Sequence, residues 1–189
     1  MKRIIWNLLY FLALVLLVYA SSLASPFPKK YDSFFKEAII FMPPGTPWQL
    51  LKAQCWQESR LDPTAIAADG GMGLCQFMPG TWNDIKSRYK LKGSPFIAKL
   101  SITACSLYMS DLYNSWSSPR SSEDRYKLAL ASYNAGIGNI LKSQEKSGWK
   151  SDYSSIESEL HKITGDRNSK ITKEYVHKIF YVWYPSMLK

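Results

Sequence analysis

The sequence predicts a mainly helical domain that carries one small, glycine-rich β-hairpin element. Apolar residues recur at intervals of three and four along most of the chain, which is the spacing of one face of an α-helix. Gly70, Gly71 and Gly73 interrupt this pattern at one place, and the segment after them is too short for a helix. Strands do not alternate with helices, so no parallel nucleotide-binding sheet is predicted.

The first 24 residues have the layout of an export signal. Lys2 and Arg3 precede the apolar residues 4–20. Small residues follow, and Ser22 and Ala24 suit a cleavage site. At about 1.5 Å per residue, the apolar stretch is also nearly long enough to cross a membrane, so a cleaved signal and an uncleaved anchor both stay open. In both cases the basic start stays in the cytoplasm and the rest is expected outside it.

A short linker and one domain are expected after this leader. Residues 25–30 contain Pro26 and Pro28, which predict an extended connection. The total length of 189 residues is that of one domain with an appendage, so a single domain is expected over residues 31–189.

Two helices are predicted before the glycine cluster. Apolar residues at intervals of three and four predict an amphipathic helix over residues 31–42, which ends before Pro43. Thr46 is a suitable N-cap and Pro47 suits the first helical position, so a second helix is predicted over residues 46–59.

The chain after the glycine cluster is again predicted to be helical. Residues 73–78 are expected to form a short hairpin or irregular strand before Thr81 caps the next helix. Two acidic residues follow Ser122, in a first turn where the helix dipole favours them. Gly136 and Gly138 are expected to end that helix. The predicted helices of this part cover residues 81–89, 97–112, 122–134, 151–163 and 169–184.

The charge balance favours an anionic partner. The chain has 24 Lys and Arg against 15 Asp and Glu, a formal charge of +9. Expected export and the lack of an arginine-rich stripe argue against nucleic acid. An anionic membrane or the bacterial wall, with its acidic peptides, remains.

The sequence does not decide whether the three cysteines are free thiols or include a disulfide. Cys55, Cys75 and Cys105 include no closely spaced pair, so no zinc site is expected. Two of them can bridge in an oxidising compartment, and Cys55 with Cys75 is the pair to test. The favoured alternative is that they stay free, because free cysteines also occur as small buried hydrophobes.

Glu58 is the residue in which chemistry is most plainly expected. On the helix over residues 46–59 it ends an apolar stripe formed by Trp48, Leu51 and Cys55. Burial beside apolar groups raises the pKa of a carboxyl and makes it a proton donor near neutral pH. The alternative is an ordinary solvated glutamate at a helix end.

Three segments, in order and with matching spacing, resemble the motifs of the soluble lytic transglycosylase domain, a lysozyme-like fold. They are Gln57-Glu58-Ser59-Arg60-Leu61-Asp62-Pro63, then Gly71-Met72-Gly73-Leu74-Cys75-Gln76-Phe77-Met78-Pro79-Gly80-Thr81, and Ala131-Ser132-Tyr133-Asn134-Ala135-Gly136. The similarity runs from Tyr31 to Tyr184 and includes Thr172 to Val176, which is similar to the closing segment without its acidic residue. Departures occur at Ala67, Met72 and Cys75.

The resemblance implies cleavage of the β-1,4 bond between N-acetylmuramic acid and N-acetylglucosamine in peptidoglycan, leaving a 1,6-anhydromuramoyl end. Glu58 would act first as the acid and then as the base, without metal or cofactor. Tyr133 would hydrogen-bond and orient Glu58. Gln76 would bind sugar N-acetyl or hydroxyl groups. The resemblance also places at the substrate cleft Met78, Thr81, Asn134, Gly136 and Tyr175.

Two other functions stay open. A hydrolytic muramidase on the same fold would need a second carboxylate, from Asp62, Asp69 or Asp84. A wall-binding or virion structural protein would keep the cleft without catalysis. The expected location is the periplasm or the inner membrane facing it, or a virion if a phage encodes the chain. The expected partners are peptidoglycan strands and, by analogy, a secretion apparatus or phage particle.

Overall fold

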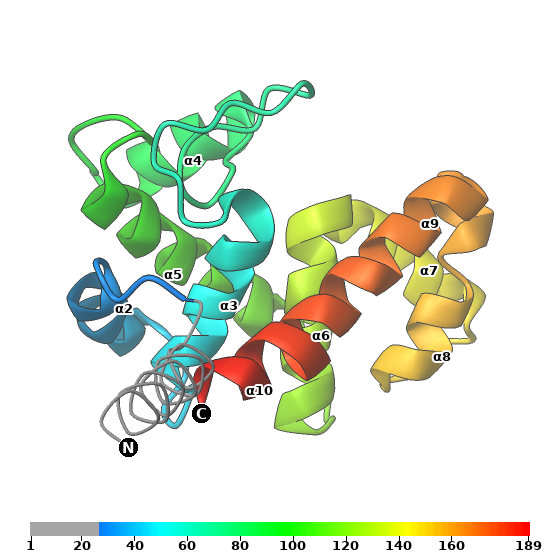
Figure 1. The fold of residues 1–189 in the computed structure, drawn as a ribbon. Coiled ribbons are helices and arrows are strands. Elements are labelled where there is room, and N and C mark those ends of the chain that lie inside the picture. Colours follow the sequence, from blue (N-terminus) through cyan, green and yellow to red (C-terminus); the bar gives the residue numbers. More distant parts are fainter. Residues whose placement is uncertain (1–26) are drawn as a thin grey trace, which may run out of the picture.

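The computed structural model describes residues 27–189, so the predicted leader over residues 1–24 and the first residues of the predicted linker lie outside the described range. The mainly helical class is confirmed (Figure 1). The helices are α2 (Asp32–Ala38), η1 (Ile39–Phe41), α3 (Trp48–Ser59), α4 (Pro79–Arg88), α5 (Ala98–Ser115), α6 (Ser122–Ala135), α7 (Ile137–Lys146), α8 (Tyr153–Ser158), α9 (His161–His177), η2 (Lys178–Trp183, a π-helix) and α10 (Tyr184–Met187). Among residues 27–189, no helix combines the length and apolar character needed to span a bilayer.

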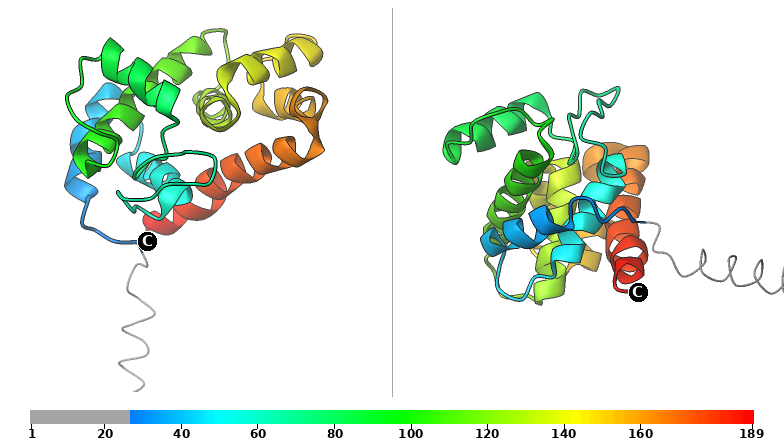
Figure 2. Two further views of the ribbon diagram at one scale, coloured as in Figure 1. Left: turned by 90° about the horizontal axis from the view of Figure 1, so that it is seen from above. Right: turned by 60° about the vertical axis from the view of Figure 1, so that its left-hand side comes forward.

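Helix α3 lies in the middle of the fold. Figure 1 shows it between α5 and the C-terminal path formed by η2 and α10, and all three pack against it. Helices α6 to α9 pack on one another in the other half of the molecule (Figures 1 and 2). Leu51 and Cys55 of α3 are fully buried with Ile102 of α5, Leu128 of α6 and Ile179 of η2. One core therefore joins segments from both ends of the described chain.

Phe27, within the predicted linker, packs on the domain. Its side chain is only 4% exposed, and its ring meets the ring of Trp56 edge-on at 5.1 Å. An aromatic ring at this position buries a large apolar area, which favours a packed arrangement over an extended free connection. The described start of the chain thus contributes to the packing around α3.

Helix α7 was not predicted. We expected Gly136 and Gly138 only to end the preceding helix, yet Gly136 ends α6 and also precedes the first residue of α7. Its φ of +82° turns the chain, after which Asn139 N donates to Gly136 O at 3.1 Å and starts the new helix. Ile140 of α7 is buried in the core, so tertiary packing stabilises a helix whose glycines argued against it.

The predicted boundaries after residue 150 were also wrong. Instead of helices over residues 151–163 and 169–184, the chain forms α8 and then α9, which contains a break at Gly165 with φ +79° and ψ +163°. After this break the backbone continues through η2 into α10. The long path is held by packing on α3 and α6, which a local pattern does not reveal.

Neither predicted threonine cap is present. Helix α3 is preceded by Pro47 and α4 by Met78, both with extended backbone angles. The hydroxyl of Thr46 instead donates to Pro43 O at 2.7 Å. Pro79 takes the first position of α4, which its fixed φ favours, and this places Thr81 inside the first turn.

The predicted β element is present in a minimal form. Met72 and Phe77 exchange two backbone hydrogen bonds of 3.0 Å, and the described residues contain only isolated bridges, Ile66 with Met72 and Met72 with Phe77. Gly73 opens the turn with φ +70°. A Cβ atom at this residue would lie 2.1 Å from Pro95 O, so the turn is pressed against the segment that precedes α5.

Candidate active site

Glu58 lies in the last turn of α3, beside the hairpin. The apolar stripe that leads to it is present, because Leu51 and Cys55 are fully buried and Trp48 packs against the core. Leu50 and Ala53 are buried too, so most sides of the helix face protein. The backbone of α3 ends immediately afterwards, at Arg60 with φ +59°. A rigid, buried helix thus holds a carboxylate at its end.

A tyrosine from α9 holds the carboxyl of Glu58. The Tyr175 hydroxyl donates to Glu58 Oε1 at 2.5 Å, and Tyr175 itself is buried. Burial raises the pKa of Glu58 to about 8, against the lowering effect of this hydrogen bond, and the charge of Asp69 adds a smaller increase. Glu58 is therefore mostly protonated at pH 7 and able to give up a proton near neutrality.

Tyr133 does not make the hydrogen bond expected of it. Its hydroxyl donates to Cys75 O at 2.7 Å, while Tyr175 takes the place next to Glu58. The ring of Tyr133 packs against Phe77 and Tyr108, with centroids 6.0 and 5.3 Å away. Tyr133 thus contacts the backbone of the hairpin instead of the carboxyl. The two tyrosines come from helices α6 and α9, and only their packing decides which one reaches Glu58.

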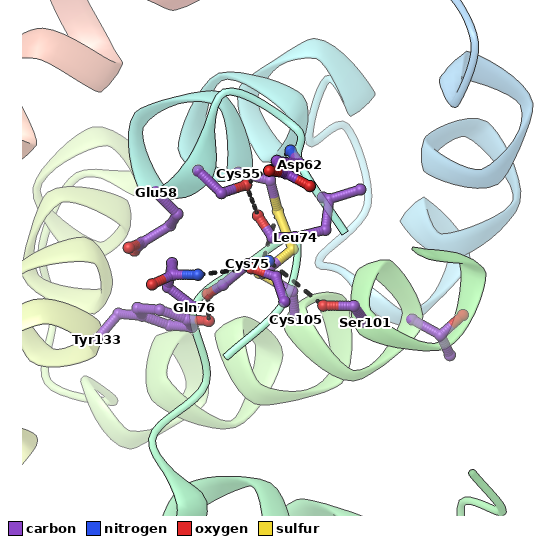
Figure 3. The surroundings of a disulfide bond; sticks show 12 residues. Cys55, Glu58, Asp62, Leu74, Cys75, Gln76, Ser101, Cys105 and Tyr133 are labelled. Carbon is purple, nitrogen blue, oxygen red and sulfur yellow. Dashed lines mark hydrogen bonds between the residues drawn. A yellow bond between two sulfur atoms is a disulfide. The ribbon is translucent and has the colours of Figure 1, made fainter. Parts of the chain in front are cut away.

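Gln76 lies next to Glu58 because of the hairpin's backbone. It has φ +52°, and its Nε2 donates to Gly73 O at 2.8 Å and to Ala65 O at 3.3 Å. Figure 3 shows Glu58, Gln76 and Tyr133 on the same side of the hairpin. Gly71 leaves room for this arrangement, since a Cβ atom there would lie 2.7 Å from Gln76 Oε1.

The hairpin is tied to three helices just beside Gln76. Ser59 Oγ of α3 donates to Leu74 O at 2.7 Å, and Cys75 N donates to Ser101 Oγ of α5 at 3.3 Å (Figure 3). Tyr133 supplies the tie to α6. Neither Ser59 nor Ser101 was predicted to have this role. Ser59 lies within a recognised motif, whereas Ser101 carries no signal in the sequence.

A disulfide adds a covalent tie at the same place. Of the alternatives left open, the structure contains the bridge between Cys55 and Cys75 and keeps Cys105 as a buried free thiol. In the described part of the chain, these cysteines form the only cluster of three potential metal ligands. Two of their sulfurs are already bonded to each other, so the cluster does not form a metal site in this state.

The other predicted site residues lie around this centre. Met78 is 43% exposed at the start of α4, and Thr81 lines a cavity of about 290 Å³ together with Asp84 and Tyr108. Asn134 is exposed at the end of α6, where its Oδ1 accepts a hydrogen bond of 2.8 Å from Thr172 Oγ1. This bond links the third motif to the closing segment, but none of these side chains is hydrogen-bonded to Glu58.

The three acids considered as second carboxylates differ in their surroundings. Asp62 is exposed, and its Oδ1 accepts hydrogen bonds from the backbone and hydroxyl of Thr64, which lower the pKa of Asp62. Asp84 lines the cavity beside Thr81. Asp69 is the carboxylate whose charge acts on Glu58. It is therefore the first acid to test for a second catalytic role.

Replacing Tyr175 by phenylalanine is expected to raise the pKa of Glu58 further. The Tyr175 hydroxyl favours the ionised carboxylate, and a hydrogen bond to a charged group contributes about 1.5–3 kcal/mol, or about one to two pKa units. Carbon-13 NMR of the labelled carboxyl measures this value directly. Tyr133→Phe is the matched control and should leave the pKa near that of the wild type. An unchanged pKa in Tyr175→Phe would contradict the hydrogen bond.

Replacing Glu58 by glutamine is expected to stabilise the fold at neutral pH. Because the pKa of Glu58 is raised from 4.5 to about 8, the unfolded chain ionises before the folded one. The wild type therefore loses stability as the pH rises from about 4.5 to 8, by about 4 kcal/mol, and the glutamine variant does not. Calorimetry should show a higher Tm for the variant at pH 7.5 and a vanishing difference near pH 4. A constant difference across this range would refute the shift.

Comparison with known proteins identifies the family of this chain. The profile of the family described as Transglycosylase SLT domain matches residues 42–156, which is more than half of the chain. Membrane-bound lytic murein transglycosylase F of Maricaulis maris is 32% identical over 111 residues, which cover 59% of this chain and 23% of that protein. Peptidoglycan transglycosylase gp16 of Escherichia phage T7 is 30% identical over 136 residues, covering 70% of this chain and 10% of that protein.

The fold is shared with solved structures. An inactive mutant of lytic transglycosylase Slt from Pseudomonas aeruginosa superposes with a TM-score of 0.67 at 18% identity, covering 86% of this chain and 25% of that one. The chain thus spans about a quarter or less of each of these proteins. Since the family profile covers more than half of the chain, from before α3 into α8, this chain belongs to the transglycosylase SLT domain family.

Proposed function

We propose that this protein is a peptidoglycan lytic transglycosylase. It cleaves the β-1,4 bond between N-acetylmuramic acid and N-acetylglucosamine and leaves a 1,6-anhydromuramoyl end. The observation that carries the proposal is the carboxyl of Glu58, which lies inside the segment that matches the family, has a pKa of about 8 and accepts a hydrogen bond from Tyr175. The names of the relatives, which are transglycosylases of murein or peptidoglycan, support the same substrate.

Glu58 performs both proton transfers in this mechanism. In its protonated form it donates to the leaving glycosidic oxygen as the C1–O bond breaks and an oxocarbenium-like state forms. The resulting carboxylate then removes the proton from the muramoyl C6 hydroxyl, whose oxygen attacks C1 and closes the anhydro ring. The hydroxyl of Tyr175 stabilises the carboxylate between these two steps. One carboxyl thus starts and ends the cycle protonated.

The remaining site residues bind and position the glycan. Gln76 offers its amide oxygen to the N–H of a sugar N-acetyl group or to a sugar hydroxyl, because its Nε2 already donates to Gly73 O and Ala65 O. Tyr133 positions Gln76 by donating to the Cys75 carbonyl. Exposed Met78 supplies an apolar contact for a sugar face. Thr81, in the first turn of α4, and Asn134, at the end of α6, line the path of the glycan. Nothing in this chemistry requires a metal ion or an organic cofactor.

The protein works outside the cytoplasm in this proposal. The predicted leader over residues 1–24 directs export, and it either is removed or anchors the chain in the inner membrane through residues 4–20. The positive charge, +9 for the whole chain, favours contact with acidic wall peptides. We expect local opening of the wall, by analogy during assembly of a secretion apparatus or phage entry; one relative is membrane-bound and another is a phage protein.

The proposed reaction is tested by the mass of its products. The purified protein is incubated with peptidoglycan, and the soluble muropeptides are analysed by mass spectrometry. A transglycosylase releases anhydro products, whereas a hydrolase releases products heavier by one water. Reducing-end products would replace the proposal by a muramidase, with Asp69 as the first candidate for the second carboxylate. A folded protein that releases no product at all would leave a wall-binding protein.

A further inference from the structure

A third sulfur lies beside the disulfide that supports the site. Cys105 of α5 is fully buried, and its Sγ is 3.8 Å from Cys55 Sγ. All three cysteine sulfurs lie within 4.8 Å of one another (Figure 3). Disulfides rearrange by direct attack of a thiolate on a bonded sulfur, and a sulfur in contact with the bridge has the shortest possible approach to it.

The two possible disulfide partners of Cys55 connect α3 to different segments. Cys75 belongs to the hairpin and directly precedes Gln76, whereas Cys105 lies in the interior of α5. A bridge from Cys55 to Cys75 therefore ties the hairpin to α3, and a bridge from Cys55 to Cys105 would tie α3 to α5. In the second case, the residues next to Gln76 would be held to the helices without a covalent bond, by the hydrogen bonds that Ser59 and Tyr133 donate and the one that Ser101 accepts.

We propose that Cys105 is an exchange partner of the Cys55–Cys75 disulfide, so that the protein has two disulfide isomers that differ in whether the hairpin beside Glu58 is covalently held. The Cys105 sulfur attacks Cys55 Sγ, the Cys55–Cys75 bond breaks, and its electron pair leaves with the Cys75 sulfur. The proton lost by Cys105 is balanced by the one that Cys75 gains. No external oxidant or reductant is consumed.

Because the Cys105 thiol stays protonated, the isomer with the Cys55–Cys75 disulfide exchanges slowly. Burial raises the pKa of this thiol strongly, and the charge of Glu58 adds to the effect. Glu58 on α3, Tyr126 and Tyr133 on α6, and Tyr175 on α9 are the titratable groups coupled to Cys105. Since the thiolate is the attacking species, exchange in the folded protein is slow at neutral pH and faster in alkaline buffer.

The isomers are distinguishable by peptide mapping, because trypsin places each cysteine in a different peptide. Cys55 falls in residues 53–60, Cys75 in residues 61–86 and Cys105 in residues 100–120. Folded wild-type protein is incubated at pH 8.5, quenched in acid, alkylated with N-ethylmaleimide in denaturant at pH 6.5, and digested. We expect peptides 53–60 and 61–86 to be linked in most molecules, and 53–60 and 100–120 in a minor fraction of about 1–10%.

Two variants each permit only one of the two disulfides that Cys55 can form. Cys75→Ala, treated with oxidised glutathione while folded, should lose both free thiols and yield only the link between peptides 53–60 and 100–120. Cys105→Ala should contain only the link between 53–60 and 61–86, whatever the incubation. Absence of the 53–60 to 100–120 link in the wild type, together with two remaining free thiols in folded Cys75→Ala, would overturn the proposal. If Cys75→Ala does not fold, the wild-type map alone decides.

The effect on catalysis rests on the proposed function and is measured separately. Cys105→Ala should cleave peptidoglycan at the wild-type rate, whereas oxidised Cys75→Ala should be about 10- to 100-fold slower, because Gln76 loses its covalent support. Equal rates would overturn the link between pairing and the site. A wild type without turnover would refute the proposed function, while the peptide map would still decide whether the sulfurs exchange.

Discussion

Replacing Glu58 by glutamine is expected to lower the rate of peptidoglycan cleavage by about 10²- to 10⁴-fold. Glutamine keeps the size of the side chain and an oxygen that can accept the hydrogen bond from Tyr175, but it has no proton to give to the leaving oxygen. In the proposed mechanism the same carboxyl also takes the second proton, so no later step compensates for the loss. Release of soluble anhydromuropeptides, followed over time by mass spectrometry, measures the rate.

The matched control for this loss is Asp62→Asn. This variant makes the same chemical change, from carboxyl to amide, four residues further along the chain. The side chain of Asp62 is exposed and accepts a hydrogen bond from the backbone N–H of Thr64. The amide oxygen can still accept from Thr64, so activity should stay within about twofold of the wild type, as for surface changes away from a site. Residual activity above about one tenth in Glu58→Gln would show that Glu58 is not the acid. A comparable loss in Asp69→Asn would favour a hydrolase.

Replacing Gly73 by alanine is expected to destabilise the protein more than the same replacement at any other glycine in the described part of the chain. The residue has φ +70°, which L-residues rarely adopt, and the added Cβ would lie 2.1 Å from Pro95 O. The neighbour is backbone, so it cannot rotate away as a side chain would. We expect unfolding to become easier by about 2–4 kcal/mol, measured as a lower midpoint in urea.

Gly148→Ala separates the contact from the backbone conformation. Gly148 has a similar φ of +74°, but a Cβ atom there would meet no atom within 4 Å. It should therefore show only the conformational penalty, about 1 kcal/mol. If both variants lose the same stability, the contact between the hairpin and Pro95 does not constrain the turn. A larger loss of stability in Gly73→Ala would show that the contact with Pro95, in the segment before α5, fixes the conformation of the hairpin that carries Gln76.

Helix existence was predictable where apolar periodicity and breakers agreed. The helix predicted over residues 97–112 is α5, and the one over 122–134 is α6, because both carry a buried stripe and end at recognisable residues. Prediction failed for α7, where Gly136 and Gly138 argued locally against a helix that packing supports. It also failed at the caps of α3 and α4, where the geometry of proline decided the first turn.

The candidate site was predictable in its members and less so in its contacts. Glu58, Gln76 and Tyr133 were recognised from three spaced motifs, and the structure brings them to one side of the hairpin. The partner of Glu58 was assigned wrongly, since Tyr175 holds it and Tyr133 holds Cys75 O. Both tyrosines lie on helices that reach α3 only after folding, so spacing along the chain carries no information on which hydroxyl comes closer.

The sequence by itself determined the family, the helical class and Glu58 as the candidate acid, because motifs and periodicity are patterns of local sequence order. Only the tertiary structure decided the pKa of Glu58, the pairing of Cys55 with Cys75 and the contact of Cys105 with that pair. These properties depend on burial and on distances between atoms that lie up to 117 residues apart along the chain. They arise when α3 and α5 pack around Cys75 of the hairpin and α9 brings Tyr175 to Glu58.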